Sequence, residues 1–176
     1  FGRKRNQYYR VRAEGQNTLV INPARHQPDQ DVNAFCQITR CQTKDETTEI
    51  QTDLTPAYVK HGAKQVIRAI KLTPSQMVVT DTMTLNEPGE VWWFAHVRGS
   101  KVTVAEDGRS ATLTQNGKTM QVSLVQPEGA KLVAMLAQPL PSSPQPAGQN
   151  PNNGAELLNP APGMDRVKRG NIPEWG

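Results

Sequence analysis

The sequence predicts an all-β fold, namely an antiparallel two-sheet β-sandwich followed by an irregular tail rich in Pro, Asn and Gly. Residues 91–98 (VWWFAHVR) are typical of a strand, because β-branched and aromatic residues predominate and successive side chains point to opposite faces. Asp107-Gly108 and Asn116-Gly117 supply the positive φ of tight hairpin turns between further strand-like runs. Strand candidates recur along the chain, and no convincing amphipathic helix interrupts them.

Residues 90–124 are expected to form an antiparallel meander of four strands. Trp92 and Trp93 would lie on opposite faces of the first strand, so at least one large aromatic surface must be covered by a second layer. A sandwich provides that layer. Other strands are expected at residues 17–22, 32–40, 48–54, 58–61, 64–72 and 77–83, with a polar loop at 23–31 and a charged turn at 44–48.

Residues 130–140 (AKLVAMLAQPL) have two interpretations. They are good helix formers, but prolines bound them and they allow only about two helical turns. We favour a strand that closes the sheet. The β-sandwich domain is therefore expected to span residues 1–138. Residues 139–176 have the composition of a linker-like tail. The start at Phe1, without a methionine, suggests part of a longer protein.

Composition and charge exclude some classes of protein. The hydrophobic fraction of 36% lies below the usual ~45–50%, as expected where a polar tail dilutes a compact domain. The net charge is +4, with basic clusters at residues 3–5 and 166–169 that are either polyanion-binding patches or solvated chain ends. No recognition helix or stacking platform points to nucleic acid. No apolar run of ~20 residues would span a membrane.

Cys36 and Cys41 are the only cysteines. On a straight strand they would face opposite ways, so a disulfide needs a bulge or a turn between them. Free thiols are the favoured alternative. A zinc site would require more ligands than this pair provides.

Residues 1–15 (FGRKRNQYYRVRAEG) provide the first candidate binding site. In an extended segment, Tyr8, Arg10 and Arg12 would share one face. A guanidinium fork beside a tyrosine is suited to binding a carboxylate or sulfate while the ring stacks on a sugar. The alternative is an edge strand whose arginine stems lie over apolar neighbours.

Residues elsewhere have structural and functional interpretations. His96 would share a face with Trp92 and Phe94, where it could contact a sugar or transfer a proton, although a partly buried structural histidine is favoured. Asp81 is expected to pair with an arginine of the opposite strand. Asp53 and Tyr58 are expected to cap a turn and to fill the core.

Five blocks of the sequence together resemble the carboxy-terminal β-sandwich region of heparinase II/III-like polysaccharide lyases. The resemblance covers roughly residues 8–138, and the order and spacing of the blocks match. Each block is weak alone, and the set is fairly specific. The blocks are YYRVRAEGQNTLVINP from Tyr8, DLTPAY from Asp53, VIRAIKL from Val66, VVTDTM from Val78 and WWFAHV from Trp92.

The resemblance implies part of a longer enzyme in which an amino-terminal α/α toroid packs on the sandwich. The reaction would be β-elimination on a uronic-acid-containing polysaccharide, glycosaminoglycan-like or alginate-like, with most catalytic residues on the toroid. The family is periplasmic or secreted. This chain would contribute a cleft wall, and the expected substrate contacts are Tyr8, Tyr9, Arg10, Arg12, Glu14, Gln16, Asn17 and His96.

Many relatives bind a structural metal in the sandwich, and this chain departs from their pattern. Gln16 stands where relatives have a metal-binding histidine, and Val-Ile precedes Arg68 where a second histidine is expected. Asp31, or else Asp29, is the nearest match to the acidic ligand. With two of three ligands missing, no cofactor is expected. The histidines that could restore a divalent-metal site only through a different geometry are His26 and His61.

The resemblance therefore predicts an acidic polysaccharide and a toroid domain of the same protein as partners, with no nucleic acid and no membrane span. The alternative is a non-catalytic carbohydrate-binding or structural β-sandwich module.

Overall fold

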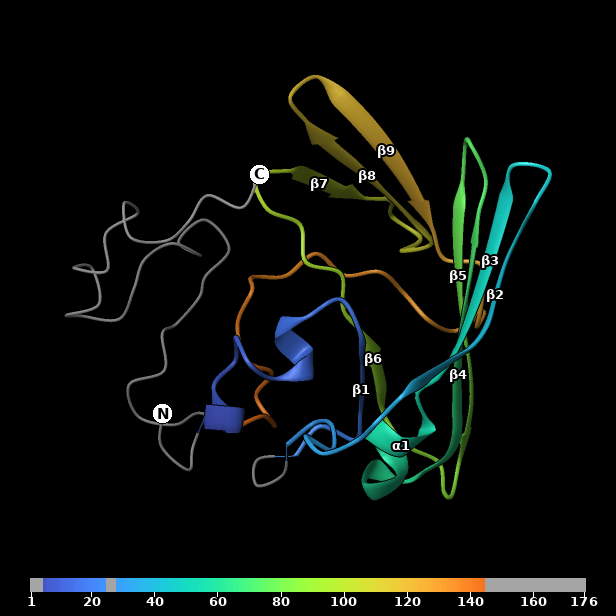
Figure 1. The fold of residues 1–176 in the computed structure, drawn as a ribbon. Helices are drawn as coiled ribbons and strands as arrows, with labels where there is room; N and C mark the ends of the chain where they lie inside the picture. The colour runs from blue at the N-terminus through green and yellow to red at the C-terminus, as the bar shows by residue number, and fades with distance from the viewer. Residues whose placement is uncertain (1–4, 25–27, 145–176) are drawn as a thin grey trace, which may run out of the picture. The chain divides into compact units, whose positions relative to one another are not determined.

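The computed structural model describes residues 5–24 and 28–144, whose regular elements are mostly β-strands (Figure 1). Every strand pairing is antiparallel, which confirms the all-β prediction. The strands lie in three sheets, of two, four and three strands, so their pairing does not give the expected two sheets. Packing of one sheet on another stays a prediction. No helix among the described residues is long and apolar enough to cross a membrane.

The described residues divide into two compact units. Unit 1 comprises the described residues up to Ala95 together with residues 139–144, and unit 2 comprises residues 96–138. The expected tail begins at residue 139, and most of it lies outside the described residues. So do His26 and nearly all of both basic clusters, of which only Arg5 is described.

Unit 1 contains a four-stranded sheet in sequential order. Asp45 and Glu46 have φ of +47° and +60°, the left-handed values that a two-residue hairpin needs, and the expected charged turn is confirmed. The predicted strands at 48–54, 64–72 and 77–83 are also confirmed. The strands are β2 (Gln37–Lys44), β3 (Thr47–Asp53), β4 (Ala63–Leu72) and β5 (Met77–Leu85).

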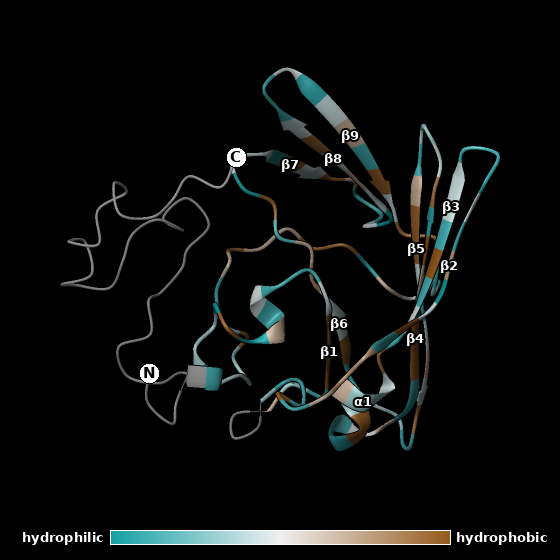
Figure 2. Ribbon diagram, viewed as in Figure 1, coloured by the Kyte–Doolittle hydropathy of each residue, from teal (hydrophilic) through white to brown (hydrophobic). Residues whose placement is uncertain are grey.

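The two-stranded sheet pairs β1 (Leu19–Ile21) with β6 (Val91–Trp93). All three residues of β1 are buried, because both faces of this ribbon are covered. Leu19 and Ile21 belong to a first core with Tyr58 and Val66, and Val20 belongs to a second core with Phe94, Ala13 and Leu140. Figure 2 shows the hydrophobic colouring of β1 and of parts of β4 and β5.

The predicted strand at 58–61 is wrong, because the chain turns there into α1 (Thr55–Tyr58) and the 3₁₀ turn η3 (Val59–His61). Pro56 lies in the first turn of α1, where its missing N–H costs nothing. Asp53 Oδ1 accepts a hydrogen bond from Thr55 N at 2.9 Å, which confirms the predicted cap. Tyr58 is fully buried, as predicted.

The predicted strand at 32–40 begins only at Gln37. Asp31 explains the late start: its Oδ1 accepts from Asn33 N at 3.0 Å, and its backbone O accepts from Ala34 N at 3.0 Å, so a turn occupies this stretch. Cys36 and Cys41 are both free thiols, as favoured from the sequence.

Unit 2 is a three-stranded meander of β7 (Lys101–Val104), β8 (Ser110–Gln115) and β9 (Lys118–Ser123). Its β8–β9 turn is the predicted Asn116-Gly117, with φ of +50° and +74°. The four strands predicted between residues 90 and 124 all form, but the prediction that they make one meander is wrong. β6 pairs with β1 and ends at Trp93, because Trp92 and Phe94 pack in the second core of unit 1.

The predicted strand at 130–140 is wrong, because no residue of that stretch forms one. The side chain of Arg109 binds backbone carbonyls of the segment that leads into this stretch. Arg109 Nη1 donates to the carbonyls of Pro127 and Ala130 at 2.7 and 2.8 Å, and Nη2 donates to that of Val125 at 2.8 Å. These bonds hold a loop.

Candidate functional site

The described residues 5–15 fold as turns, so the extended segment predicted there and its edge-strand alternative are both wrong. The turns are η1 (Arg5–Gln7) and η2 (Ala13–Gly15). Between them, the N–H groups of Val11 and Arg12 donate to the carbonyl of Tyr8 at 2.9 and 3.2 Å. Gly15 is needed for this path, since a Cβ there would lie 2.1 Å from the carbonyl oxygen of Tyr9.

The turns separate the two arginines that were expected to act together. Arg10 is exposed, whereas Arg12 is 2% exposed and belongs to a buried polar cluster with Glu14, Asp29 and Ser143. Arg12 Nη1 lies 3.0 Å from Glu14 Oε1, and Arg12 Nε lies 3.3 Å from Asp29 Oδ2. The charge of Arg12 is therefore met within the protein, as a buried charge requires.

Ser143 closes this cluster from a stretch that the sequence suggested was linker. Its Oγ donates to Glu14 Oε2 at 2.6 Å and accepts from Arg12 Nη2 at 3.3 Å. The backbone N–H of Leu140 also donates to Glu14 Oε2, at 3.4 Å. Residues 139–144 are thus packed on the first block through buried hydrogen bonds.

Burial dominates the electrostatics of the cluster. It raises the pKa of Glu14 above its ordinary value, although Ser143, Arg12 and the Leu140 N–H favour the charged carboxylate and act in the opposite direction. Burial, with the neighbouring charge of Glu14, raises the pKa of Tyr9 to about 12. Tyr9 is 4% exposed and remains a neutral phenol at physiological pH.

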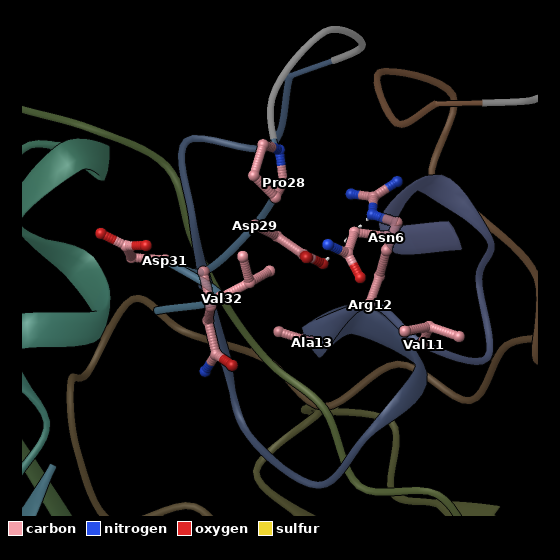
Figure 3. A pocket seen from close by; sticks show the side chains of 9 residues that line it. Asn6, Val11, Arg12, Ala13, Pro28, Asp29, Asp31 and Val32 are labelled. Carbon is pink, nitrogen blue, oxygen red and sulfur yellow. Dashed lines mark ion pairs between the residues drawn. The ribbon is translucent and has the colours of Figure 1, made fainter. Parts of the chain in front are cut away.

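A pocket of about 230 Å³ lies beside the cluster (Figure 3). Its carboxylates, Asp29 and Asp31, outnumber its one guanidinium, that of Arg12, which Figure 3 shows paired with Asp29. Asp29 pairs with Arg12 and Asp31 pairs with Lys60, so both cations are already engaged and neither is left for an acidic sugar. The residues that line the pocket are Asn6, Val11, Arg12, Ala13, Pro28, Asp29, Gln30, Asp31 and Val32.

Asp31, the candidate metal ligand, forms an ion pair with Lys60 at 2.6 Å. The hydrogen bond from Lys60, followed by that from the Asn33 N–H, lowers the pKa of Asp31. His61 is buried, and burial lowers its pKa. Across residues 5–24 and 28–144, no group of three or more His, Cys, Asp and Glu side chains could hold a metal ion.

The exposed members of the first block lie on the turn that the buried cluster holds. Gln16 Nε2 donates to the carbonyl of Arg10 at 3.0 Å, and Arg68 Nη1 donates to the carbonyl of Asn17 at 3.4 Å. Arg10, Gln16 and Asn17 are exposed and Tyr8 is half-buried. We call Arg10, Gln16 and Asn17 the exposed turn.

His96 does not extend the face of β6, because the strand ends at Trp93 and His96 belongs to unit 2. Trp92 and Phe94 form a stacked pair, with ring centroids 5.9 Å apart and planes 13° apart. Phe94 is buried in the second core, so this aromatic pair supports the fold.

Two structural networks complete the surroundings. Arg68 and Asp81 form the predicted cross-strand pair, with Nε–Oδ1 at 2.7 Å and Nη2–Oδ2 at 2.9 Å. The hydroxyl of Tyr58 donates to the carbonyl of Leu19 at 2.7 Å. Nothing in the sequence indicated that Asp29 and Ser143 contact Arg12. The only signal was that Asp29 is an acidic residue within the polar loop at 23–31.

Comparison of the chain with protein-family models gave no match, and comparison with curated proteins gave none either.

Proposed function

We propose that this chain is the β-rich carboxy-terminal part of a polysaccharide lyase that cleaves uronic-acid-containing polysaccharides by β-elimination. The observation that carries the proposal is that the five family-like sequence blocks meet in shared cores. Leu19, Tyr58 and Val66, from the first three blocks, lie in one core, and Met83 of the fourth packs against it. Phe94 of the fifth block packs with β1 in the other core. The segments that carry the resemblance therefore pack against one another in the fold.

The reaction requires that the uronate carboxylate be neutralised, that the proton on the adjacent carbon be removed, and that the leaving oxygen be protonated. The first block cannot supply these groups together in its described form, since Arg12 is neutralised by Glu14 and Asp29. We assign the catalytic groups to an amino-terminal α/α toroid of the same protein. No metal takes part in this assignment.

The exposed turn is the part of this chain that we assign to the cleft wall. Arg10 can pair with a carboxylate, and the amides of Gln16 and Asn17 can bond sugar hydroxyls. The buried polar cluster supports the turn from below, so its role is positioning. A polymer substrate of this kind fits a periplasmic or secreted protein, which fractionation of the producing cells would test.

The whole protein, including the toroid, should be incubated with alginate and with glycosaminoglycans. The expected result is ultraviolet absorbance from an unsaturated uronate, which only elimination produces. Absence of this product from every acidic polysaccharide offered would refute the enzyme proposal.

A second candidate is a non-catalytic carbohydrate-binding module. Trp93 favours it, because its side chain is 44% exposed and an exposed indole can stack on a sugar ring. Binding of the chain to a neutral polysaccharide, lost in Trp93→Ala while elimination by the whole protein is absent, would favour this candidate over the lyase.

A further inference from the structure

The four-stranded sheet of unit 1 has a polar face opposite the first core. Cross-strand register places Arg40, Gln51, Ala69 and Thr80 in one row, and Glu49 lies opposite Lys71 in the next. Alternation along the strands directs their neighbours Ile50 and Ile70 to the other face. Val78, opposite Lys71 in the register, adds one apolar side chain to this face. We call the other six residues, Arg40, Glu49, Gln51, Ala69, Lys71 and Thr80, the polar sheet face.

A depression of about 210 Å³ lies on this face. Its centre is low because Ala69 is the small residue between Gln51 and Thr80 in the same row. The volume is below the roughly 300 Å³ at which pockets begin to enclose drug-sized ligands. It is suited to one ring of a longer polymer.

Two cations of this face share one carboxylate. Arg40 Nη2 lies 3.2 Å from Glu49 Oε2, and Lys71 Nζ lies 3.5 Å from Glu49 Oε1. The three side chains are 53%, 41% and 56% exposed for Arg40, Glu49 and Lys71, so a ligand can reach them. The trio carries one excess positive charge. Glu49 also demonstrates that a single carboxylate can contact both cations.

We propose that the polar sheet face binds one uronate unit of an acidic polysaccharide. The uronate carboxylate contacts Arg40 and Lys71 in competition with Glu49, and sugar hydroxyls contact Gln51 and Thr80. The choice of polymer rests on the proposed function. No aromatic ring belongs to the six residues, and this disfavours single-stranded nucleic acid, which binds largely by base stacking.

The first test removes the two cations. The double variant Arg40→Gln/Lys71→Gln of the full chain should bind alginate more weakly at low salt, by up to about fivefold for each cation removed, because exposed ion pairs are weak. The control Lys101→Gln/Lys118→Gln removes the same charge from unit 2 and should bind as the unmodified chain does. An equal loss of alginate affinity in the two double variants would show that only the net charge of the protein matters, and this would overturn the proposal.

The second test has the opposite sign. Glu49→Gln removes the carboxylate that competes for Arg40 and Lys71 and should bind alginate more tightly than Glu106→Gln, which changes the net charge equally in unit 2. No difference between these single variants would contradict competition by Glu49. Circular dichroism and the unfolding midpoint of each variant should match those of the unmodified chain, since the substituted side chains on the polar sheet face are largely exposed.

Two further polymers identify the ligand chemistry. Dextran sulfate carries sulfates without carboxylates, and single-stranded DNA carries phosphates. Loss of binding to either polymer in Arg40→Gln/Lys71→Gln, with alginate binding unchanged, would overturn the assignment to a uronate. The lyase assay tests the proposed reaction separately. If the whole protein binds alginate through the polar sheet face but does not cleave it, only the proposed reaction is refuted. If it cleaves alginate while the variants bind as the unmodified protein does, only the proposed binding site is refuted.

Discussion

Ser143 and Glu14, 129 positions apart in the sequence, are joined by a buried hydrogen bond of 2.6 Å from the serine hydroxyl to the glutamate carboxylate. Both residues have 0% exposure. The bond connects the first block to the stretch at 139–144, so the exposed turn depends on a segment far along the chain.

Replacing Ser143 by Ala should destabilise the protein by about 1–3 kcal/mol, because a buried carboxylate loses a donor that nothing replaces. The free energy of unfolding in urea measures this. Ser142→Ala is the control, since Ser142 is only half-buried, and it should change stability by less than about 0.5 kcal/mol. Equal effects of the two variants would show that the Ser143–Glu14 bond contributes nothing specific.

Arg12→Met should cost about 3–5 kcal/mol, because it leaves the buried carboxylates of Glu14 and Asp29 without their cation. Arg10→Met is the matched control on the same turn and, being exposed, should have little effect on stability. Thermal or urea unfolding compares them. A larger loss for Arg10→Met would mean that the two arginines have been assigned the wrong roles.

Glu14 should give the protein an unusual pH dependence. Its pKa is raised above the ordinary 4.5, mainly by burial, so the folded state holds this proton more tightly than the unfolded state. The resulting stability is fully present below pH 4.5 and is lost as the pH rises through the folded-state pKa. Glu14→Gln should flatten this decline in unfolding free energy measured at successive pH values.

Asp53 provides the control of opposite sign. Hydrogen bonds from Thr55 lower its pKa, so its contribution is present above the ordinary value of 3.8 and is lost as the pH falls through the folded-state pKa. Asp53→Asn should alter the unfolding free energy only in this acidic range of pH. A flattened decline above pH 4.5 in Asp53→Asn, with none in Glu14→Gln, would contradict the assignment.

The Arg68–Asp81 pair should couple strongly. Two short hydrogen bonds join the side chains, which are only 15% exposed for Arg68 and 10% for Asp81. A double-mutant cycle with Arg68→Gln and Asp81→Asn should therefore give a coupling energy of about 1–3 kcal/mol. The exposed Arg40–Glu49 pair is the control, with an expected coupling of about 0.2–1 kcal/mol. Equal couplings would show that burial does not strengthen the Arg68–Asp81 pair.

Local signals predicted the parts of the fold that depend on local chemistry. The runs that became β1, β3, β4 and β5 carry strand-forming residues, and Asn116-Gly117 supplies the backbone angles of its hairpin. The pairing of Asp81 with an arginine of the opposite strand could also be predicted, because both residues lie on predicted strands. Pairing between distant segments could not be predicted in this way, because the partner of β6 depends on where Trp92 and Phe94 are buried.

The candidate site was predicted less well for the same reason. The residue types of the first block suggested a charged binding face, but whether an arginine is exposed or neutralised depends on residues such as Asp29 and Ser143 that lie elsewhere in the sequence. Arg109 shows a similar effect in unit 2, where one side chain binds the carbonyls of Val125, Pro127 and Ala130 and holds a loop that no local signal indicated.

The most direct measurement is the mass of the products that the whole protein releases from alginate and from glycosaminoglycans. Elimination breaks the glycosidic bond without adding water, so the account predicts an unsaturated uronate at the new non-reducing end, with each product pair one water lighter than after hydrolysis. Products with the hydrolytic mass, or no cleavage at all, would contradict it.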